Sequence, residues 1–418
     1  MARILLLCWR DSTHPQGGGS ERYLEHVAAG LAAAGHTVVY RTSRSAGAAR
    51  TVVDDEGVRF SRGGGRFTVY PRALAAMLLG RVGLGPLGGL RRPDVVVDTQ
   101  NGVPFFSRLA TRAPVVLLVH HIHREQWPVA GRLVARIGWW IESWLSPRLH
   151  ARSQYVTVSL PSADELAGLG VDPARIAVVR GGLDPLPEGV GAGGPATRTD
   201  APRLVVLSRL VPHKHVEDAL EVVAALRERH PGLVLDVIGS GWWSDRLREH
   251  AADLGLVGPD GPDRPGGAVL FHGHVDEATK HRILAGAWAH LMPSRKEGWG
   301  LAVSEAAQHG VPTVGYHHAV GLRDSIDDGE TGLLVDDLPA MTAAADRLLD
   351  ETGLRHRLGE AARAKAAGLS WAVTGAAMTH VLEAVRDGRR VRGVVSGARP
   401  ADPAGPADPT GPAVPAGS

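Results

Sequence analysis

The sequence predicts an α/β protein made of two similar halves, each a doubly wound and mostly parallel sheet with helices on both faces. Continuous Val/Leu runs such as "DVVVDT" and "APVVLLVHH" are typical of strands buried on both sides. These runs alternate with segments of helical apolar spacing, such as "SERYLEHVAAGLAAAG". Residues 184–202, rich in Pro and Gly, interrupt the alternation, which then restarts. The pattern therefore indicates two α/β units joined by a hinge.

The expected strands of the first half are "RILLLCW", "HTVVYRT", "DVVVDT", "APVVLLVHH", "QYVTVS" and "RIAVVRG"; those of the second are "RLVVLSRL", "LVLDVIGSG", "AVLFHG", "AHLMPS", "VPTVGY" and "TGLLVDD". Five segments follow from this pattern. They are an N-terminal unit over 1–184, a linker over 185–202, a second unit over 203–370, a helix over 371–390, and a tail over 391–418. The tail is rich in Pro, Ala and Gly without an apolar period, and we expect it to be disordered.

Length and composition limit the class of protein. A chain of 418 residues is too long for one ordinary core. Its 44% hydrophobic and 22% charged residues are typical of a soluble globular protein, and a net charge of +2 gives no argument for binding nucleic acid. The single cysteine, Cys8, lies in an apolar run and is expected to be a buried thiol. Because we find neither a signal peptide nor a membrane-spanning stretch, we expect a cytoplasmic protein.

Ligands of open α/β sheets bind beyond the carboxyl ends of the strands. Arg209 and Lys214 follow a strand of the second half, in the turn before a helix. Lysine is scarce in this chain, with four of the 46 basic residues, so its presence in this turn is informative. An arginine fork and a lysine charge both suit phosphate. The alternative is an ordinary solvated turn.

The stretch "SRKEGWGLAVSEA" places Glu297 in a loop after a strand and Glu305 one turn into the next helix. Glycines at 298 and 300 allow backbone N–H groups to approach a ligand closely. The two carboxylates could accept hydrogen bonds from sugar hydroxyls and from a vicinal diol such as a ribose. The alternative is a helix start at which acidic residues are favoured by the helix dipole.

Two further stretches follow strands of the first half. His120, His121 and His123 invite a zinc site, but neighbouring strand residues point to opposite faces and no cysteine is close. A histidine that serves the cleft as a hydrogen-bonding or acid/base group is favoured over a metal ligand. Residues 17–19, all glycine, could cradle a phosphate or an acceptor. They lack the G-x-G-x-x-G order, which disfavours a nicotinamide dinucleotide site.

Three motifs in this order, "SRLVPHKHVEDALEVVAAL", "EGWGLAVSEAAQHGVPTV" and "DGETGLLVDD", give the chain its clearest likeness. The sequence resembles the family 4 retaining glycosyltransferases of the GT-B fold over nearly its whole length. That resemblance implies two Rossmann-like units facing a central cleft, with the helix over 371–390 returning toward the first unit. It also implies transfer of a sugar from a nucleotide-diphosphate sugar, with no metal ion and no cofactor.

The resemblance also implies roles for individual residues. Arg209 and Lys214 would bind the donor diphosphate, Glu297 the hydroxyls of the transferred sugar, and Glu305 the ribose, while His120 would face the sugar from the other unit. The remaining donor contacts that it implies are Gly18, Gly19, Gly273, His274, Val275, Gly298, Trp299, Gly300 and Leu301. The double histidine leaves open whether His120 or His121 faces the sugar.

The acceptor and the cellular site stay open. The segment from Val129 to Arg152 is helix-like and carries several Arg and Trp residues, which could lie on the inner surface of a membrane. The alternative is a helix packed within the first unit, with Trp140 and Trp144, four residues apart, in its core. The donor base, the sugar, the linkage and the oligomeric state are not indicated. A catalytically silent nucleotide-sugar binder is the main alternative function, and a nicotinamide-dependent oxidoreductase is a weaker one.

Overall fold

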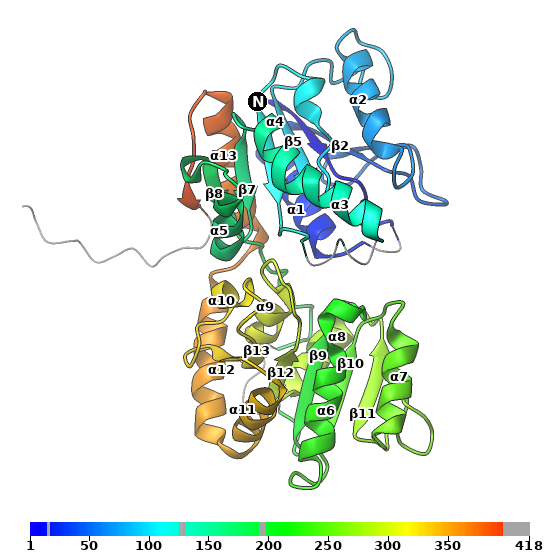
Figure 1. Ribbon diagram of the computed structural model, residues 1–418, viewed down its shortest axis with the longest axis vertical. Helices are drawn as coiled ribbons and strands as arrows, with labels where there is room; N and C mark the ends of the chain where they lie inside the picture. The colour runs from blue at the N-terminus through cyan, green and yellow to red at the C-terminus, as the bar shows by residue number, and fades with distance from the viewer. Residues whose placement is uncertain (15–16, 125–126, 128–130, 192–197, 396–418) are drawn as a thin grey trace, which may run out of the picture.

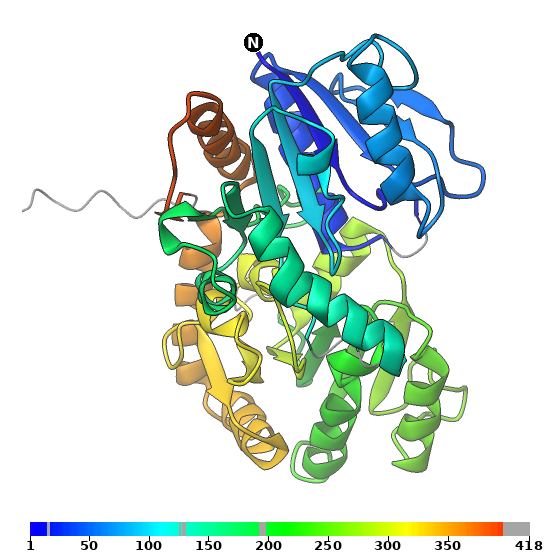
Figure 2. The same cartoon turned by 45° about the horizontal axis from the view of Figure 1, so that its top comes forward.

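The chain forms two α/β units, each built around its own sheet, and one unit lies above the other in Figure 1 (see also Figure 2). The structure, a computed structural model, describes residues 1–14, 17–124, 127, 131–191 and 198–395. This arrangement confirms the predicted fold class.

The first sheet has nine strands in the order β15-β8-β7-β6-β5-β1-β2-β4-β3, where β15 is Gly393–Val394 near the end of the chain. All pairs are parallel except the antiparallel pair of β3 and β4. Alternate residues of β1 point to opposite faces. Leu6 packs with α1 and α13, and Leu5 packs with α2. The strands are β1 (Arg3–Leu7), β2 (Thr37–Thr42), β3 (Thr51–Val53), β4 (Arg59–Arg62), β5 (Val95–Gln100), β6 (Val115–Val119), β7 (Gln154–Thr157) and β8 (Ile176–Val178). The helices are α1 (Gly19–Ala33), α2 (Val69–Gly80), α3 (Arg132–Trp140), the π-helical η3 (Ile141–Leu145), α4 (Ser146–Leu149) and α5 (Leu160–Gly168).

The second sheet has six parallel strands in the order β11-β10-β9-β12-β13-β14. Its two faces are covered by different helices. Val206 packs with α6 and α11, and Val205 packs with α8 and α9. The strands are β9 (Arg203–Leu207), β10 (Val234–Ile238), β11 (Val269–Gly273), β12 (Ala289–Met292), β13 (Thr313–Tyr316) and β14 (Gly332–Val335). The helices are α6 (Val216–Leu226), α7 (Ser244–Asp253), α8 (Glu277–Gly286), α9 (Leu301–Gln308), α10 (Leu322–Ser325), α11 (Leu338–Asp350) and α12 (Thr352–Ala367).

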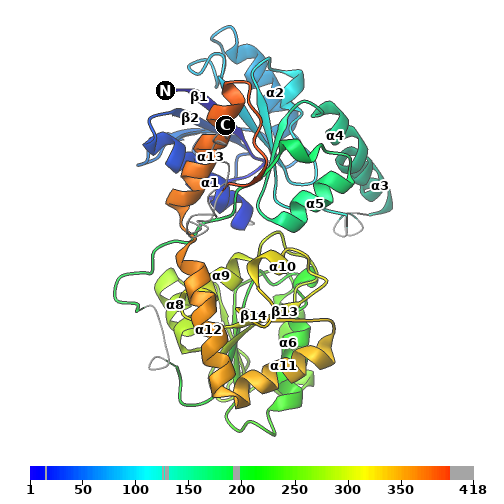
Figure 3. The same cartoon turned by 90° about the vertical axis from the view of Figure 1, so that its left-hand side faces the viewer.

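The last helix, α13 (Trp371–Arg386), leaves the second unit and lies along α1 of the first (Figure 3). Glycines at the crossing allow the close approach, because a Cβ on Gly30 would lie only 3.1 Å from the Cα of Gly375. The Trp371 ring stacks on His26 with a centroid distance of 4.1 Å. The chain thus crosses between the units a second time.

Some expectations fail. The prediction of a disordered tail from residue 391 is wrong for 391–395, because β15 (Gly393–Val394) pairs in parallel with β8 and Gln154 bonds the backbone of Val391. Residues 396–418 lie outside the described part of the chain.

Cys8 is buried as expected, and its burial raises the thiol pKa to about 12. Within the described ranges, no helix is both long and apolar enough to cross a membrane.

Candidate active site

The carboxyl edges of the two sheets meet, and the loops singled out in the sequence lie where they touch. A Cβ placed on Gly298, after β12, would lie 2.8 Å from the carbonyl oxygen of His120, after β6. A Cβ on Gly18, after β1, would lie 3.6 Å from Nε of Arg209, after β9. Glycine at 298 therefore allows the backbones of the two units to approach closely, whereas at Gly18 a Cβ would make only ordinary contact with the Arg209 side chain.

Lys214 and Glu297 form the central ion pair of this edge. Lys214 ends a short 3₁₀ turn, η6 (Pro212–Lys214), and His215 follows it in a left-handed conformation with φ of 47°. Lys214 Nζ lies 2.5 Å from Glu297 Oε1, and both side chains are largely buried, at 13% and 10% exposure. Two residues 83 positions apart, each predicted separately to bind the donor, are thus brought into contact.

Arg209 adds a second positive charge at the same place. Its residue remains partly exposed, but the protein around the guanidinium and then the nearby Arg10 charge lower its pKa. Since a bound anion would counter both effects, Arg209 is well placed to meet negative charge. Arg10 itself is paired with the buried Glu21, whose other carboxylate oxygen accepts from the backbone N–H of Gly18.

Glu305, in the second turn of α9, is paired with another lysine. Lys280 Nζ lies 2.7 Å from Glu305 Oε1 and 2.6 Å from Glu277 Oε2. All four lysines of the chain take part in ion pairs in the described structure, and the remaining two pairs are Lys296 with Glu165 and Lys365 with Asp327. Lys296, in the loop after β12, joins the two units through its pair with Glu165 of α5.

His120 is buried at the edge where the two units meet. Its ring meets Tyr23 edge-on at 5.1 Å, and burial lowers its pKa to about 4, so the imidazole is neutral near pH 7. Its Nε2 is buried and has no hydrogen-bond partner among the described residues. His121 Nδ1 would lie 3.6 Å from a Cβ on Gly298, and the His121 ring packs on His123 at 4.4 Å. Both His120 and His121 therefore lie beside the Gly298 loop.

His123 has a structural role instead. Its backbone N–H and its Nδ1 both bond the buried Glu142 of η3, at 3.1 and 3.0 Å, and Trp127 Nε1 donates to the same carboxylate. In the described part of the chain, a single group of His, Asp and Glu side chains has the spacing to hold a metal, and none of these three histidines belongs to it.

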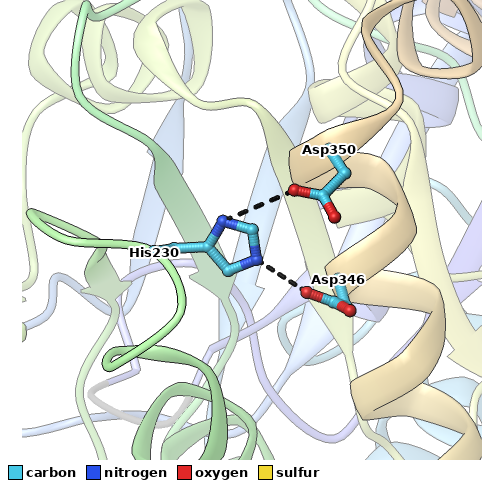
Figure 4. A group of neighbouring side chains, drawn as sticks. All are labelled: His230, Asp346 and Asp350. Atoms are coloured by element: carbon cyan, nitrogen blue, oxygen red, sulfur yellow. Dashed lines mark hydrogen bonds and ion pairs between the residues drawn. The ribbon is translucent and has the colours of Figure 1, made fainter.

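That group is His230, Asp346 and Asp350 (Figure 4). It lies at the turn before β10 and on α11, at the amino edge of the second sheet and away from the cleft. His230 Nε2 lies 2.6 Å from Asp346 Oδ1, and Arg229 contacts both carboxylates. Arg229 thus already supplies the positive charge that a cation would bring, and the group is explained as an ion-pair cluster.

The other residues predicted to contact the donor lie at the same edge. Gly273, His274 and Val275 follow β11, where the carbonyl of Gly273 accepts from Gly239. Gly300 begins α9 with φ of 82°, which favours glycine, and Leu301 packs where side chains at Gly19 and Gly181 would be. The resemblance implies that Trp299 contacts the donor through its backbone; its side chain is buried in the core and donates to Ser304 Oγ at 3.2 Å. Only its backbone is available to a ligand.

The sequence analysis missed the contacts that hold the two units together. Arg180 pairs with Asp324 of α10 at 2.6 Å and lies over the Trp299 ring, and Arg22 of α1 lies 3.6 Å from Glu277 of α8. It also missed Asn101, just after β5, whose buried Nδ2 has no partner among the described residues. Its place after the strand "VVVDTQ" was the available signal for Asn101. Nothing in the sequence pairs residues as distant as Arg180 and Asp324.

Comparison with known proteins agrees with this geometry. Residues 17–185 match the model of Glycosyltransferase Family 4, and residues 194–365 match that of Glycosyl transferases group 1. A glycogen synthase of Mycobacterium tuberculosis is 29% identical over 93% of this chain and 96% of its own. A GDP-mannose-dependent α-(1-6)-phosphatidylinositol monomannoside mannosyltransferase of Mycolicibacterium smegmatis is 30% identical over 65% of this chain and 70% of its own.

Solved structures share the fold at low identity. Sucrose-phosphate synthase from Thermosynechococcus elongatus superposes with a TM-score of 0.75 at 19% identity, covering 92% of this chain and 99% of that one. WaaG, a glycosyltransferase involved in lipopolysaccharide biosynthesis, gives a TM-score of 0.65 at 16% identity, covering 91% and 99%. Together with the two family models, which follow one another along the chain, these matches show that the protein belongs to the family 4 glycosyltransferases of the GT-B fold.

Proposed function

We propose that this glycosyltransferase moves a hexose-type sugar from a UDP- or GDP-sugar to a hydroxyl of a glycan, a lipid-linked glycan or a small metabolite, with retention of configuration and without a metal ion. The observation that carries the proposal is the contact of Lys214 with Glu297, beside Arg209, at the edge where the two sheets face each other. The relatives named as a glycogen synthase and a GDP-mannose-dependent mannosyltransferase support a nucleotide-sugar donor.

The ion pair explains how a donor would be received. The diphosphate of the donor would bind Lys214 and Arg209, and the sugar hydroxyls would donate hydrogen bonds to Glu297. Lys214 and Glu297 would thus each exchange their present partner for a group of the donor. During transfer the bond from the anomeric carbon to the phosphate oxygen breaks, and a bond to the acceptor oxygen forms on the same face. The acceptor proton passes to the leaving phosphate oxygen. Positive side chains already fixed around the departing diphosphate would stabilise its growing negative charge.

The assay that tests this proposal measures release of nucleoside diphosphate and formation of a glycoside from UDP-, GDP- and ADP-sugars, with and without a chelator. We expect turnover with a UDP- or GDP-sugar at a rate that the chelator leaves unchanged. Binding of the free nucleoside diphosphate without turnover of any donor would favour the silent binder, and loss of rate with the chelator would overturn the metal-free mechanism.

Replacing Glu305 with Gln should weaken binding of the free nucleoside diphosphate by about tenfold, because a charge-assisted hydrogen bond to the ribose diol is lost. Isothermal titration measures the change. Glu277→Gln is the matched control, since Glu277 contacts the same Lys280 but is not assigned to the ribose. If both variants bind alike, Glu305 acts through Lys280 and the ribose assignment is wrong.

We also propose that the outer face of α3, η3 and α4 contacts an anionic membrane surface, at the inner leaflet. The expected alternative, with Trp140 and Trp144 in the core, is wrong: these residues are 48% and 44% exposed. Leu133 and Ile137 on the same side are 71% and 51% exposed. A surface helix of a soluble protein normally turns its apolar side inward. Here the apolar side faces out, and Figure 2 shows no other segment in front of this helix.

The charge of this face supports an anionic membrane as its partner. Arg132, Arg136, Arg148 and Arg152 accompany the apolar residues and are exposed. The one acidic residue from 131 to 152, Glu142, is buried and bonded to His123 and Trp127. Basic and apolar side chains on one exposed face match a bilayer that carries negative headgroups.

Ile137→Asp should lower binding to phosphatidylglycerol-containing vesicles by at least about tenfold, because the apolar burial of one isoleucine is lost. Cosedimentation measures it, and binding should also weaken at high salt. Leu84→Asp serves as the control, because Leu84 is 59% exposed but lies outside this face. Equal binding of both variants would contradict the assignment.

A further inference from the structure

Arg41 is a buried arginine without an acidic partner. It is the fifth residue of β2, at the carboxyl edge of the first sheet, and it is 4% exposed. Its NH1 group donates to the carbonyl and the hydroxyl of Ser61, each at 3.2 Å. Its Nε is buried and has no hydrogen-bond partner among the described residues. No carboxylate of those residues lies within 4.0 Å of the guanidinium. An arginine offers five N–H donors, so most of its capacity is unused.

Other buried arginines of the chain have more partners within the protein, although Nε of Arg355 also lacks one among the described residues. Arg62, on the neighbouring β4, lies 2.5 Å from Asp11. Arg355 donates to the carbonyls of Leu348 and Leu349 near the end of α11 and lies over Trp288. Removing a charge from water is costly unless a partner compensates it. Arg41 lacks such compensation from the described residues.

The surroundings of Arg41 add to the cost of burying its charge without a bound anion. Burial, and then the positive charge of Arg72 in the first turn of α2, lower the pKa of Arg41. The glycine loop after β4 lies against the guanidinium, since a Cβ on Gly63 would be 2.9 Å from NH2 and 3.1 Å from NH1. Gly64, with φ of 90°, then turns the chain toward α2. One buried and one exposed arginine therefore flank this loop, and both charges lack an opposing anion in the ion pairs of the described residues.

We propose that Arg41 and Arg72 bind a phosphate group carried by the acceptor. A guanidinium fork matches a phosphate in shape and charge. The strand order β6-β5-β1-β2 places Arg41 on the same edge as His120, three strands away. At the usual spacing of neighbouring strands this is about 14 Å. The acceptor would thus be held by its phosphate at one side of the cleft while a hydroxyl reaches the transfer point. Calling the ligand the acceptor rests on the proposed function; phosphate binding at Arg41 does not.

Thermal unfolding of the full chain tests the site directly. The melting temperature is measured with increasing inorganic phosphate and, for comparison, with chloride at the same ionic strength. Both series are run in excess UDP and again in excess GDP, so that the donor site is occupied. We expect phosphate to raise the melting temperature of the wild type and of Arg81→Ala, a control at the other end of α2. In Arg72→Ala and in Arg41→Gln the affinity for phosphate should fall at least tenfold. No rise in the wild type, or an equal rise in all four proteins, would overturn the site.

Two phosphate esters identify the source of the ligand. Stabilisation by glucose 6-phosphate but not by glucose, lost in Arg72→Ala, would indicate a soluble phosphorylated acceptor. Stabilisation by monomeric dihexanoyl phosphatidylglycerol, lost in the same variant, would indicate a lipid phosphate. If inorganic phosphate binds but neither ester does, the acceptor role is overturned. If phosphate binds and no donor is turned over, the proposed function fails while the site stands.

Discussion

Lys214→Ala should lower the rate of sugar transfer by at least about a hundredfold, because a positive charge aimed at the leaving diphosphate is lost. The melting temperature should change by only a few degrees, since Glu297 keeps 10% of its side chain exposed and can draw water to replace the ion pair. The effect should fall on kcat as well as on KM, because negative charge on the diphosphate grows toward the transition state. Steady-state kinetics and thermal unfolding measure the two quantities.

Lys365→Ala is the matched control for this substitution. Lys365 also forms a lysine–carboxylate pair, with Asp327 at 2.9 Å, but it lies on α12 and is assigned no part in donor binding. Its loss should leave the rate within about twofold of wild type, as is usual for a surface ion pair. Wild-type turnover in Lys214→Ala would remove this residue from the mechanism, and an equal loss in both variants would show that the effect is structural.

Gly298→Ala should reduce kcat/KM by roughly tenfold to a hundredfold while leaving each unit folded. The added Cβ would lie 2.8 Å from the carbonyl oxygen of His120, closer than carbon and oxygen tolerate, so the loop that carries Glu297 must move away from the first unit. A displacement of about 1 Å between reacting groups is enough for such a loss. Kinetics with the same donor and acceptor measure the loss.

Gly353→Ala is the control for the added methyl group. Gly353 lies in α12, and a Cβ there meets nothing within 4 Å. We expect its activity to be unchanged and its stability to be equal or slightly higher, because alanine has a higher helix propensity than glycine. Unchanged activity in Gly298→Ala would mean that the contact between Gly298 and His120 does not persist during turnover.

The parts of the fold with a strong local signal could be predicted from the sequence. Continuous apolar strands such as β5 and β6 were expected, because their burial is visible in consecutive Val and Leu residues. The short β4 was not expected, since "RFSR" places Phe60 and Ser61 between two arginines and has no apolar run. Its pairing depends on β2 beside it, which is a tertiary contact.

The candidate site divides in the same way. Position after a strand was sufficient to select Lys214, Glu297 and His120, because parallel strands bring their carboxyl ends to one edge. The pairing of Lys214 with Glu297, and of Arg180 with Asp324, depends on how loops far apart in the chain meet. The outward orientation of Trp140 and Trp144 could not be predicted either. Spacing defines one side of a helix, but only the packed structure decides whether that side faces the core or the solvent.

The anomeric configuration of the first product tests the central claim most directly. The full chain is incubated with an α-linked UDP- or GDP-hexose and an acceptor. The proton NMR spectrum of the new glycoside is recorded as soon as the product forms. Same-face transfer at the Lys214, Arg209 and Glu297 site predicts an α-glycoside. A β-glycoside as the first product would contradict the account, because it would require attack on the opposite face of the sugar.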